Sequence, residues 1–283
     1  MNSPGIYSQE QVEAWKPITE AVHNQGGLIF LQLWHVGRIS HPLLQPDHQL
    51  PVSSSAIKAE GKISTPAGYK EMVTPRALQT HEIPGIVDDY RNACKNTIEA
   101  GFDGVEIHGA NGYLPDQFLH DGSNKRSDRY GGSIENRCRF ILEITDACCD
   151  EIGSGRVGIR LSPSGIFKGM FDSDPVALYE HLMRRLNEFN LTYLHLMEPW
   201  MAMEPEEKYS HYLKQVTPHF RKVFGGPLIT NVNFDVDSGN DIIQKGYADL
   251  VAFGKPYISN PDLVERFKSG ASLAPWDKDT FYQ

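Results

Sequence analysis

The sequence contains few cysteines and none of the spacings that cysteine chemistry requires. Only Cys94, Cys138, Cys148 and Cys149 occur in 283 residues. They form no CxxC pair and no metal-ligand spacing, so we expect no metal site. Reduced thiols of this kind are typical of a reducing compartment, which indicates a cytoplasmic protein.

Long apolar runs and targeting signals are also missing. No stretch approaches the roughly 20 apolar residues that span a bilayer, and the first ten residues lack the basic start and apolar core of a secretory signal. The net charge is −9, from 27 basic and 36 acidic side chains. A protein of this charge repels polyanions, which argues against nucleic acid or an anionic membrane as partner. A small anionic cofactor is not excluded, because local N–H groups and one or two cations outweigh the overall charge at contact distance. We expect a small-molecule substrate and a monomer or homodimer.

The glycine-rich fingerprints of open nucleotide-binding sheets, G-x-G-x-x-G and G-x-x-x-x-G-K-[ST], are absent as well. Short β-branched and aromatic runs instead alternate with amphipathic helix patterns, such as Ile83–Ala100 and Val176–Asn190. The strand-like runs are Leu28–His35, Gly104–His108, Val157–Leu161, Tyr193–Met197, Leu228–Asn231 and Leu250–Gly254. This alternation predicts a parallel α/β sheet, and polar residues at many strand ends favour a (β/α)8 TIM barrel. No linker divides the chain, so residues 1–283 are expected to form a single domain.

The strand count differs from that of a complete barrel. Six strands are found instead of eight, and the chain opens with the helix pattern Gln9–Gln25. We therefore expect the first two strands of the barrel to be missing ahead of Met1. Such a barrel would leave two unpaired sheet edges.

A candidate catalytic group follows the second strand. Alternation along this strand turns Glu106 and His108 toward the barrel interior. His108 and Asn111 can both donate to one carbonyl oxygen and stabilise its negative charge as a conjugated double bond accepts hydride. Tyr113 could protonate the neighbouring carbon. The alternative is a hydrogen-bonded His and Asn that only cap a loop.

The same alternation places Arg160 inward at the end of the third strand. A buried guanidinium requires an anion or a strong acceptor, and a reduced flavin with negative charge near N1 is one such partner. An internal ion pair with Glu106 is the alternative. On the first strand, Gln32 and Trp34 share a face; an amide can bind a heteroaromatic edge, and the indole could form a pocket wall or simply belong to the core.

The last two units predict a phosphate site. The runs Leu228–Phe234 and Ala252–Lys255 end the final strands, and a short helix pattern, Asn260–Phe267, follows. Barrels often bind phosphate at this place, where Lys255 would add a positive charge. A solvated lysine after a glycine turn is the alternative. The stretch Asn124–Tyr130 is interpreted as a salt-bridged loop and Ser133 as a helix N-cap.

Five segments in order resemble those of a known family. The segments are His108–Phe140 (HGANGYLPDQFLHDGSNKRSDRYGGSIENRCRF), Leu31–Pro42, Gly158–Gly165, Tyr193–Pro199 and Ala248–Phe267. Together they resemble the Old Yellow Enzyme family, which includes plant oxophytodienoate reductases and bacterial ene-reductases. The resemblance implies a (β/α)8 barrel with non-covalent FMN, reduced by NADPH or NADH, that passes hydride to the C=C bond of an α,β-unsaturated carbonyl.

The resemblance also implies roles for single residues. His108 and Asn111 match the pair that holds the substrate carbonyl, and Tyr113 matches the proton donor. Gln32 and Arg160 match the contacts to the flavin pyrimidine edge.

Further positions follow from the same comparison. Trp34 and Tyr282 match residues that line the substrate site. Asn233 and Lys255, with Gly254 beside it, fall on the phosphate-binding positions.

The sequence departs from the family pattern at several points. Nothing matches the Pro-x-Thr element of the family's first two strands. Lys255 stands where arginine is usual and therefore lacks its bidentate fork. Val232 stands where glycine is common and would crowd the phosphate.

Two other functions remain open at this stage. The missing start favours a truncated, non-catalytic barrel that binds FMN weakly or not at all. A barrel lyase or aldolase could use Arg160 to bind a phosphorylated substrate, but no inward lysine ends a strand, as a Schiff base would require.

Overall fold

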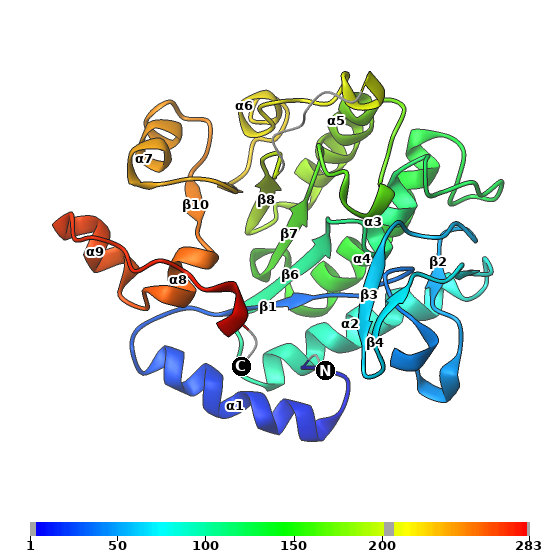
Figure 1. Ribbon diagram of the computed structural model, residues 1–283, viewed down its shortest axis with the longest axis horizontal. Helices are drawn as coiled ribbons and strands as arrows, with labels where there is room; N and C mark the ends of the chain where they lie inside the picture. The colour runs from blue at the N-terminus through cyan, green and yellow to red at the C-terminus, as the bar shows by residue number, and fades with distance from the viewer. Residues whose placement is uncertain (1–3, 201–206, 282–283) are drawn as a thin grey trace.

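The structure, a computed structural model, describes residues 4–200 and 207–281 and contains one main sheet of six parallel strands. The strands, in their spatial order, are β1 Phe30–Leu33, β6 Gly104–Gly109, β7 Val157–Leu161, β8 Tyr193–Met197, β9 Leu228–Asn231 and β10 Leu250–Ala252. Figure 1 shows them as an arc that runs from β1 to β10. Each main strand lies beside the main strand before it in the chain, without the reversal of order that defines a doubly wound sheet. This topology agrees with the barrel prediction.

Helices connect these strands and begin where the sequence supplies caps. They are α1 Gln9–His23, α2 Ile83–Glu99, α3 Leu114–Leu119, α4 Ile134–Ile152, α5 Pro175–Leu186, α6 Thr217–Phe220, α7 Val236–Gln244, α8 Lys255–Ser259 and α9 Leu263–Ser269. Ser8 and Gln11 form a capping box at α1, and Asp235 forms another at α7. The Ser133 side chain accepts from Asn136 N–H at the start of α4, so its predicted role as N-cap is confirmed. No helix in the described part of the chain is both long and apolar enough to cross a membrane.

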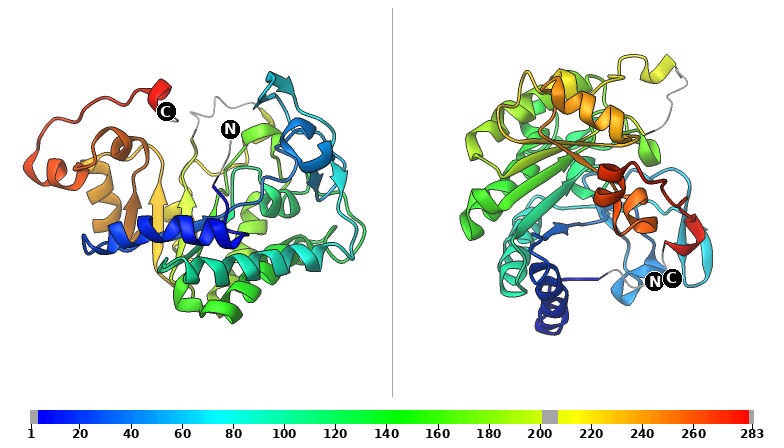
Figure 2. Two further views of the ribbon diagram at one scale, coloured as in Figure 1. Left: turned by 90° about the horizontal axis from the view of Figure 1, so that it is seen from below. Right: turned by 90° about the vertical axis from the view of Figure 1, so that its left-hand side faces the viewer.

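The core lies between the sheet and the helices outside it. Val105, Ile107 and Ile159 are fully buried in one apolar cluster that also contains residues of α2 and α4. At the β1 end, α1 lies beside α2 (Figure 2), and Trp15 of α1 contacts Phe102 edge to face at 5.3 Å. The outward positions of the strands therefore form the core, and their alternate positions face the barrel interior.

The arc ends at two edges. On the outer sides of β1 and β10, the described residues contribute no further strand of this sheet. Leu250 of β10 is 56% exposed, whereas Leu194 in the central β8 is fully buried. Both edge strands are also shorter than predicted. β1 begins at Phe30 and ends at Leu33, and β10 ends at Ala252, two residues before the predicted end. A strand with a neighbour on one side only has fewer ladder hydrogen bonds to extend it.

Small elements absent from the sequence prediction lie between β1 and α2. They are β2 Val52–Ser53, which pairs with β5 Arg76–Ala77, and the hairpin of β3 Lys62–Thr65 with β4 Gly68–Glu71. Two predicted helices also differ at their ends. The predicted Val176–Asn190 ends as an α-helix at Leu186, and Asn190 has a φ of +54°, which ends the helical conformation. The predicted helix from Asn260 begins later, at Leu263.

Candidate functional site

The end of β6 and the loop after it carry the predicted catalytic residues, and side chains of two other segments fix this loop by hydrogen bonds. Asn111 N–H donates to Ser162 Oγ at 2.9 Å, just beyond β7. Gly112 N–H donates to Asp116 Oδ2 of α3 at 2.8 Å. Asn111 has a φ of +58°, a conformation that asparagine tolerates better than most residues. The loop therefore has one defined shape at the carboxyl end of the sheet.

Three predicted site residues meet at this end. The ring of Trp34, which follows β1, lies 4.8 Å from that of Tyr113 and 6.3 Å from that of His108, measured between centroids. The rings of His108 and Tyr113 lie 5.2 Å apart. Trp34 is 47% exposed. It is therefore not a core residue, and its role as a pocket wall stays a prediction.

The environment of His108 favours a neutral imidazole. Burial, assisted by the nearby charge of Arg160, lowers the pKa of His108 to about 4. Its Nδ1 is buried and has no hydrogen-bond partner among the described residues. A neutral ring with an N–H free to donate is what polarisation of a carbonyl oxygen requires.

The ion pair between Arg160 and Glu106, the alternative interpretation of the sequence, does not form. Among the described residues, Arg160 has no carboxylate within 4.0 Å, and its Nε is buried without a partner. Glu106 instead accepts from Gln32 Nε2 at 2.6 Å and contacts His195 Nδ1 at 2.9 Å. Burial lowers the pKa of Arg160, and the charge of Glu106 only partly opposes this effect. The guanidinium is thus available to an external acceptor.

The inward side of the central strands presents further unpaired polar atoms. Strand pairing aligns His108 with Arg160 and Arg160 with His195 across β6, β7 and β8. The buried atoms without partners in the described part of the chain include His108 Nδ1, Arg160 Nε, His195 Nε2 and Asn231 Oδ1. Buried polar groups in proteins are normally paired, so this row fits a bound polar ring system such as a flavin.

The predicted phosphate residues follow β9 and β10, which are paired with each other. Val232 and Asn233 have φ values of +84° and +61°, so a β-branched residue occupies a conformation that suits glycine. Gly254 precedes α8 at its N-cap position. Lys255 Nζ lies 4.7 Å from the centroid of the Trp276 ring, so a cation–π contact occupies this ammonium. The phosphate contacts of Asn233, Gly254 and Lys255 therefore stay a prediction. Tyr282, predicted to line the substrate site, lies outside the described residues.

A small cleft of about 40 Å³ adjoins Asn111. Ser162, Phe167 and Trp200 are among its lining residues, and the two aromatic rings stack with 5.9 Å between centroids. The sequence interpretation did not single out either ring. Both belong to loops that follow β7 and β8, and this shared position was the available signal.

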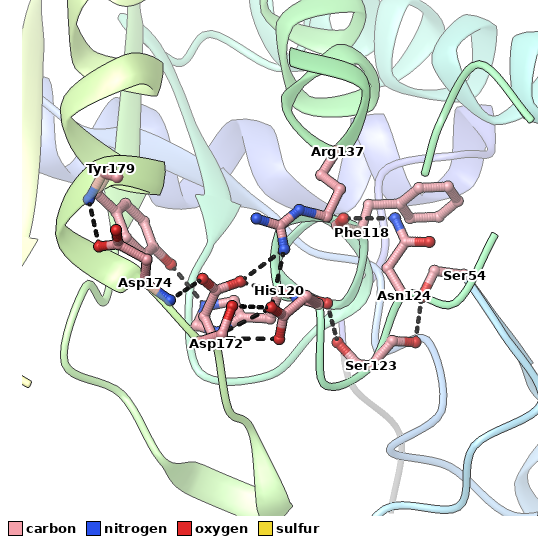
Figure 3. A network of polar contacts seen from close by, with 12 residues as sticks. Ser54, Phe118, His120, Ser123, Asn124, Arg137, Asp172, Asp174 and Tyr179 are labelled. Atoms are coloured by element: carbon pink, nitrogen blue, oxygen red, sulfur yellow. Dashed lines mark hydrogen bonds and ion pairs between the residues drawn. The ribbon is translucent and has the colours of Figure 1, made fainter. Parts of the chain in front are cut away.

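A buried polar network behind the loop was also missed. Tyr179 OH donates to Asp116 Oδ1 at 2.9 Å, and His120 Nε2 lies 3.1 Å from the same oxygen. Burial alone would lower the pKa of His120, but Asp116 outweighs it and raises that pKa. Figure 3 shows the network continuing to Asp172 and Arg137. The available signal was the occurrence of Asp and His four residues apart, beside Leu114, Phe118 and Leu119.

Other predictions for this region are confirmed or remain untested. Arg126 and Asp128 form an ion pair, which confirms the salt-bridged loop. Among the described residues, no group of three or more His, Cys, Asp or Glu side chains could hold a metal ion.

The two histidines with low pKa values make folding stability depend on pH. Burial lowers the pKa of His35 and of His108 to about 4, against about 6.5 for the unfolded chain. Between these values the unfolded chain binds more protons, so their contribution to the free energy of unfolding is lost as pH falls from 6.5 to 4. We expect His35→Gln with His108→Gln to reduce this slope in urea denaturation at pH 4.5 to 7. The exposed His81→Gln should leave it unchanged, and equal slopes in all three proteins would refute the assignment.

The chain is similar in sequence to a known family of flavin oxidoreductases. Residues 1–274 match the family model described as NADH:flavin oxidoreductase / NADH oxidase family. The chain is 50% identical over 282 residues to 12-oxophytodienoate reductase 1 of Oryza sativa subsp. japonica, covering 99% of this chain and 72% of that protein. It is 46% identical over 288 residues to 12-oxophytodienoate reductase 2 of Arabidopsis thaliana, covering 99% and 75%.

Solved structures agree with these relatives. The Old Yellow Enzyme homologue of Zymomonas mobilis superposes with a TM-score of 0.93 at 40% identity, covering 99% of this chain and 78% of that one. Morphinone reductase in complex with tetrahydroNAD gives a TM-score of 0.91 at 47% identity, covering 99% and 76%. The predicted α/β barrel class and the resemblance to Old Yellow Enzyme are thereby confirmed. The chain is an oxidoreductase that belongs to the NADH:flavin oxidoreductase / NADH oxidase family.

Proposed function

We propose that this protein is an FMN-dependent ene-reductase that uses NADPH or NADH to reduce the C=C bond of α,β-unsaturated carbonyl compounds. The observation that carries the proposal is the inward row of Arg160 and His108, whose buried nitrogens lack partners in the described part of the chain, beside the loop of Asn111 and Tyr113. The relatives support the proposal, since they are named as reductases of 12-oxophytodienoate and morphinone.

The residues that would hold the flavin lie on β1 and β7 and just after β9 and β10. Gln32 and Arg160 offer an amide and a guanidinium to the pyrimidine edge, and Asn233, Gly254 and Lys255 offer donors to the phosphate. When bound, the flavin would take hydride from the nicotinamide and deliver it to the substrate C=C bond. On phosphate binding, the Lys255 ammonium would either move away from the Trp276 ring or contact the ring and the phosphate together.

The substrate would be held by the loop after β6. A neutral His108 and the Asn111 amide donate hydrogen bonds to the carbonyl oxygen and stabilise negative charge there. Tyr113 supplies a proton to the α-carbon, and Trp34, with Tyr282 beyond the described residues, borders the pocket. The nicotinamide would use the same opening as the enone, which is consistent with the absence of a Gly-rich dinucleotide fingerprint.

The remaining features of the proposal concern context. The partner is a small molecule and not a nucleic acid or a membrane, in keeping with the charge of −9. Free cysteines favour a reducing, cytoplasmic compartment, where the single-domain chain of residues 1–283 would act as a monomer or homodimer.

FMN binding and enone turnover by the purified chain test this function. We expect FMN fluorescence to be quenched on titration, and cyclohexenone to be reduced to cyclohexanone with NADPH or NADH. Arg160→Gln should weaken FMN binding about 10- to 100-fold, because hydrogen bonds to a charged group contribute about 1.5–3 kcal/mol.

The exposed Arg184→Gln on α5 is the matched control, since its partner Glu180 lies on the same helix. Its FMN affinity should equal that of the wild type. A folded wild-type chain that takes up no FMN would instead support the non-catalytic barrel.

A further inference from the structure

We propose that Glu106 is a positioning residue, which orients the amide of Gln32 and balances the charge of Arg160 beneath the cofactor. This proposal rests on the proposed function. It assigns a task to a buried carboxylate that would touch neither the substrate nor the reacting atoms. The cofactor would meet Gln32 and Arg160, and Glu106 acts through both.

The contacts of Glu106 come from the adjacent strand β1 and from β8, two strands away. Gln32 of β1 and Glu106 of β6 are register partners, and Gln32 Nε2 lies 2.6 Å from Glu106 Oε1. The other oxygen, Oε2, lies 2.9 Å from Nδ1 of His195 on β8. The side chain of Glu106 is only 12% exposed. One carboxylate thus joins β1, β6 and β8 inside the barrel.

The contact with Glu106 determines which face Gln32 offers. A carboxylate can only accept hydrogen bonds, so the Gln32 amide must turn an N–H toward Glu106. Its Oε1 and its second N–H then point elsewhere, and Gln32 as a whole is exposed toward the open interior. A donor beside an acceptor complements a flavin pyrimidine edge, where an imide N–H lies beside a carbonyl. The opposite amide orientation would place donor against donor.

The charge on Glu106 matters as well. Burial alone would raise the pKa of Glu106, but His195, Gln32 and Arg160 outweigh burial and hold that pKa below its ordinary value. An ionised Glu106 therefore acts on Arg160 through its charge, although the two side chains form no ion pair. Removing the negative charge of Glu106 leaves the positive charge of Arg160 without a counter-charge. The more positive field would make reduction of a bound flavin more favourable.

The first test is Glu106→Gln, measured by the midpoint potential of bound FMN. We expect the potential to rise by at least ~30 mV, which is a tenfold change in the equilibrium constant of a two-electron couple. FMN affinity should fall, because a glutamine can present its own N–H to Gln32 and reverse that amide. Glu106→Asp keeps the charge and should restore most of the potential.

Glu180→Gln is the matched control, since Glu180, on the outer helix α5, is likewise a carboxylate with a histidine partner, His219. Its potential should equal that of the wild type. An unchanged potential in Glu106→Gln would overturn this proposal. FMN binding and enone turnover by the wild type would still support the proposed function. A wild-type chain without FMN overturns both.

Gln32→Leu keeps the amide claim testable if Glu106→Gln fails to fold, because Gln32 is exposed and its loss leaves the core untouched. We expect it to weaken FMN binding about tenfold and to shift the flavin absorption band. FMN affinity equal to that of the wild type would overturn the claim that an oriented Gln32 amide recognises the cofactor.

Discussion

Replacing His108 and Asn111 together by alanine should lower kcat for cyclohexenone reduction by at least about 10²–10³-fold, the cost usually found for losing one such donor. His108 lies near the end of β6 and Asn111 in the loop that follows, and the low pKa of His108, about 4, favours a neutral ring. Without them, the carbonyl oxygen would develop its negative charge with no donor from this loop. Steady-state kinetics with NADPH and cyclohexenone measure the effect.

FMN binding separates this effect from damage to the fold. The double variant should retain FMN affinity, because the proposed FMN contacts come from other residues. The exposed pair His81→Ala with Asn240→Ala is the control and should keep wild-type turnover. Unchanged turnover in the His108 and Asn111 variant, with FMN bound, would show that these residues do not hold the substrate.

The largest expected loss of stability follows from removing Asp172. Its Oδ2 lies 2.8 Å from Arg137 Nη1 and accepts from Asp121 N–H at 2.8 Å, and the Asp172 side chain is fully buried (Figure 3). Asp172→Ala would leave the Arg137 guanidinium buried without its main partner. We expect the free energy of unfolding in urea to fall by about 3–5 kcal/mol.

A surface ion pair supplies the comparison. Asp262 pairs with Arg266 at 2.8 Å, and the Asp262 side chain is 55% exposed. Asp262→Ala should therefore change the free energy of unfolding by at most about 1 kcal/mol. Similar losses in Asp172→Ala and Asp262→Ala would mean that the buried pair contributes no more than a solvated one.

The central strands could be predicted from the sequence, because each is a short apolar run with neighbours on both sides. The predicted bounds of β7, β8 and β9 agree with the structure, whereas those of β1 and β10, at the edges of the arc, were too long. Alternation along β6 and β7 also placed His108 and Arg160 correctly in the interior. A period of two along a strand depends only on local geometry.

Contacts between strands could not be predicted in the same way. The sequence offered Arg160 as a possible partner of Glu106, but Glu106 contacts Gln32 and His195 instead. Register depends on how strands distant in the sequence pair, which no local pattern contains. The network of Asp116, His120 and Tyr179 was also missed because it joins segments distant in the sequence, since Tyr179 belongs to α5, which follows the next strand, β7.

The two side-chain clamps on the loop after β6 have a consequence for reading mutational scans. Ser162 and Asp116 hold the backbone at Asn111 and Gly112, so the loop that carries the proposed carbonyl donor Asn111 is shaped before any ligand arrives. A scan scored by turnover alone would rank these two residues with those that meet the enone. Slow exchange of the Asn111 and Gly112 amide hydrogens with solvent would instead mark them as the scaffold of the loop.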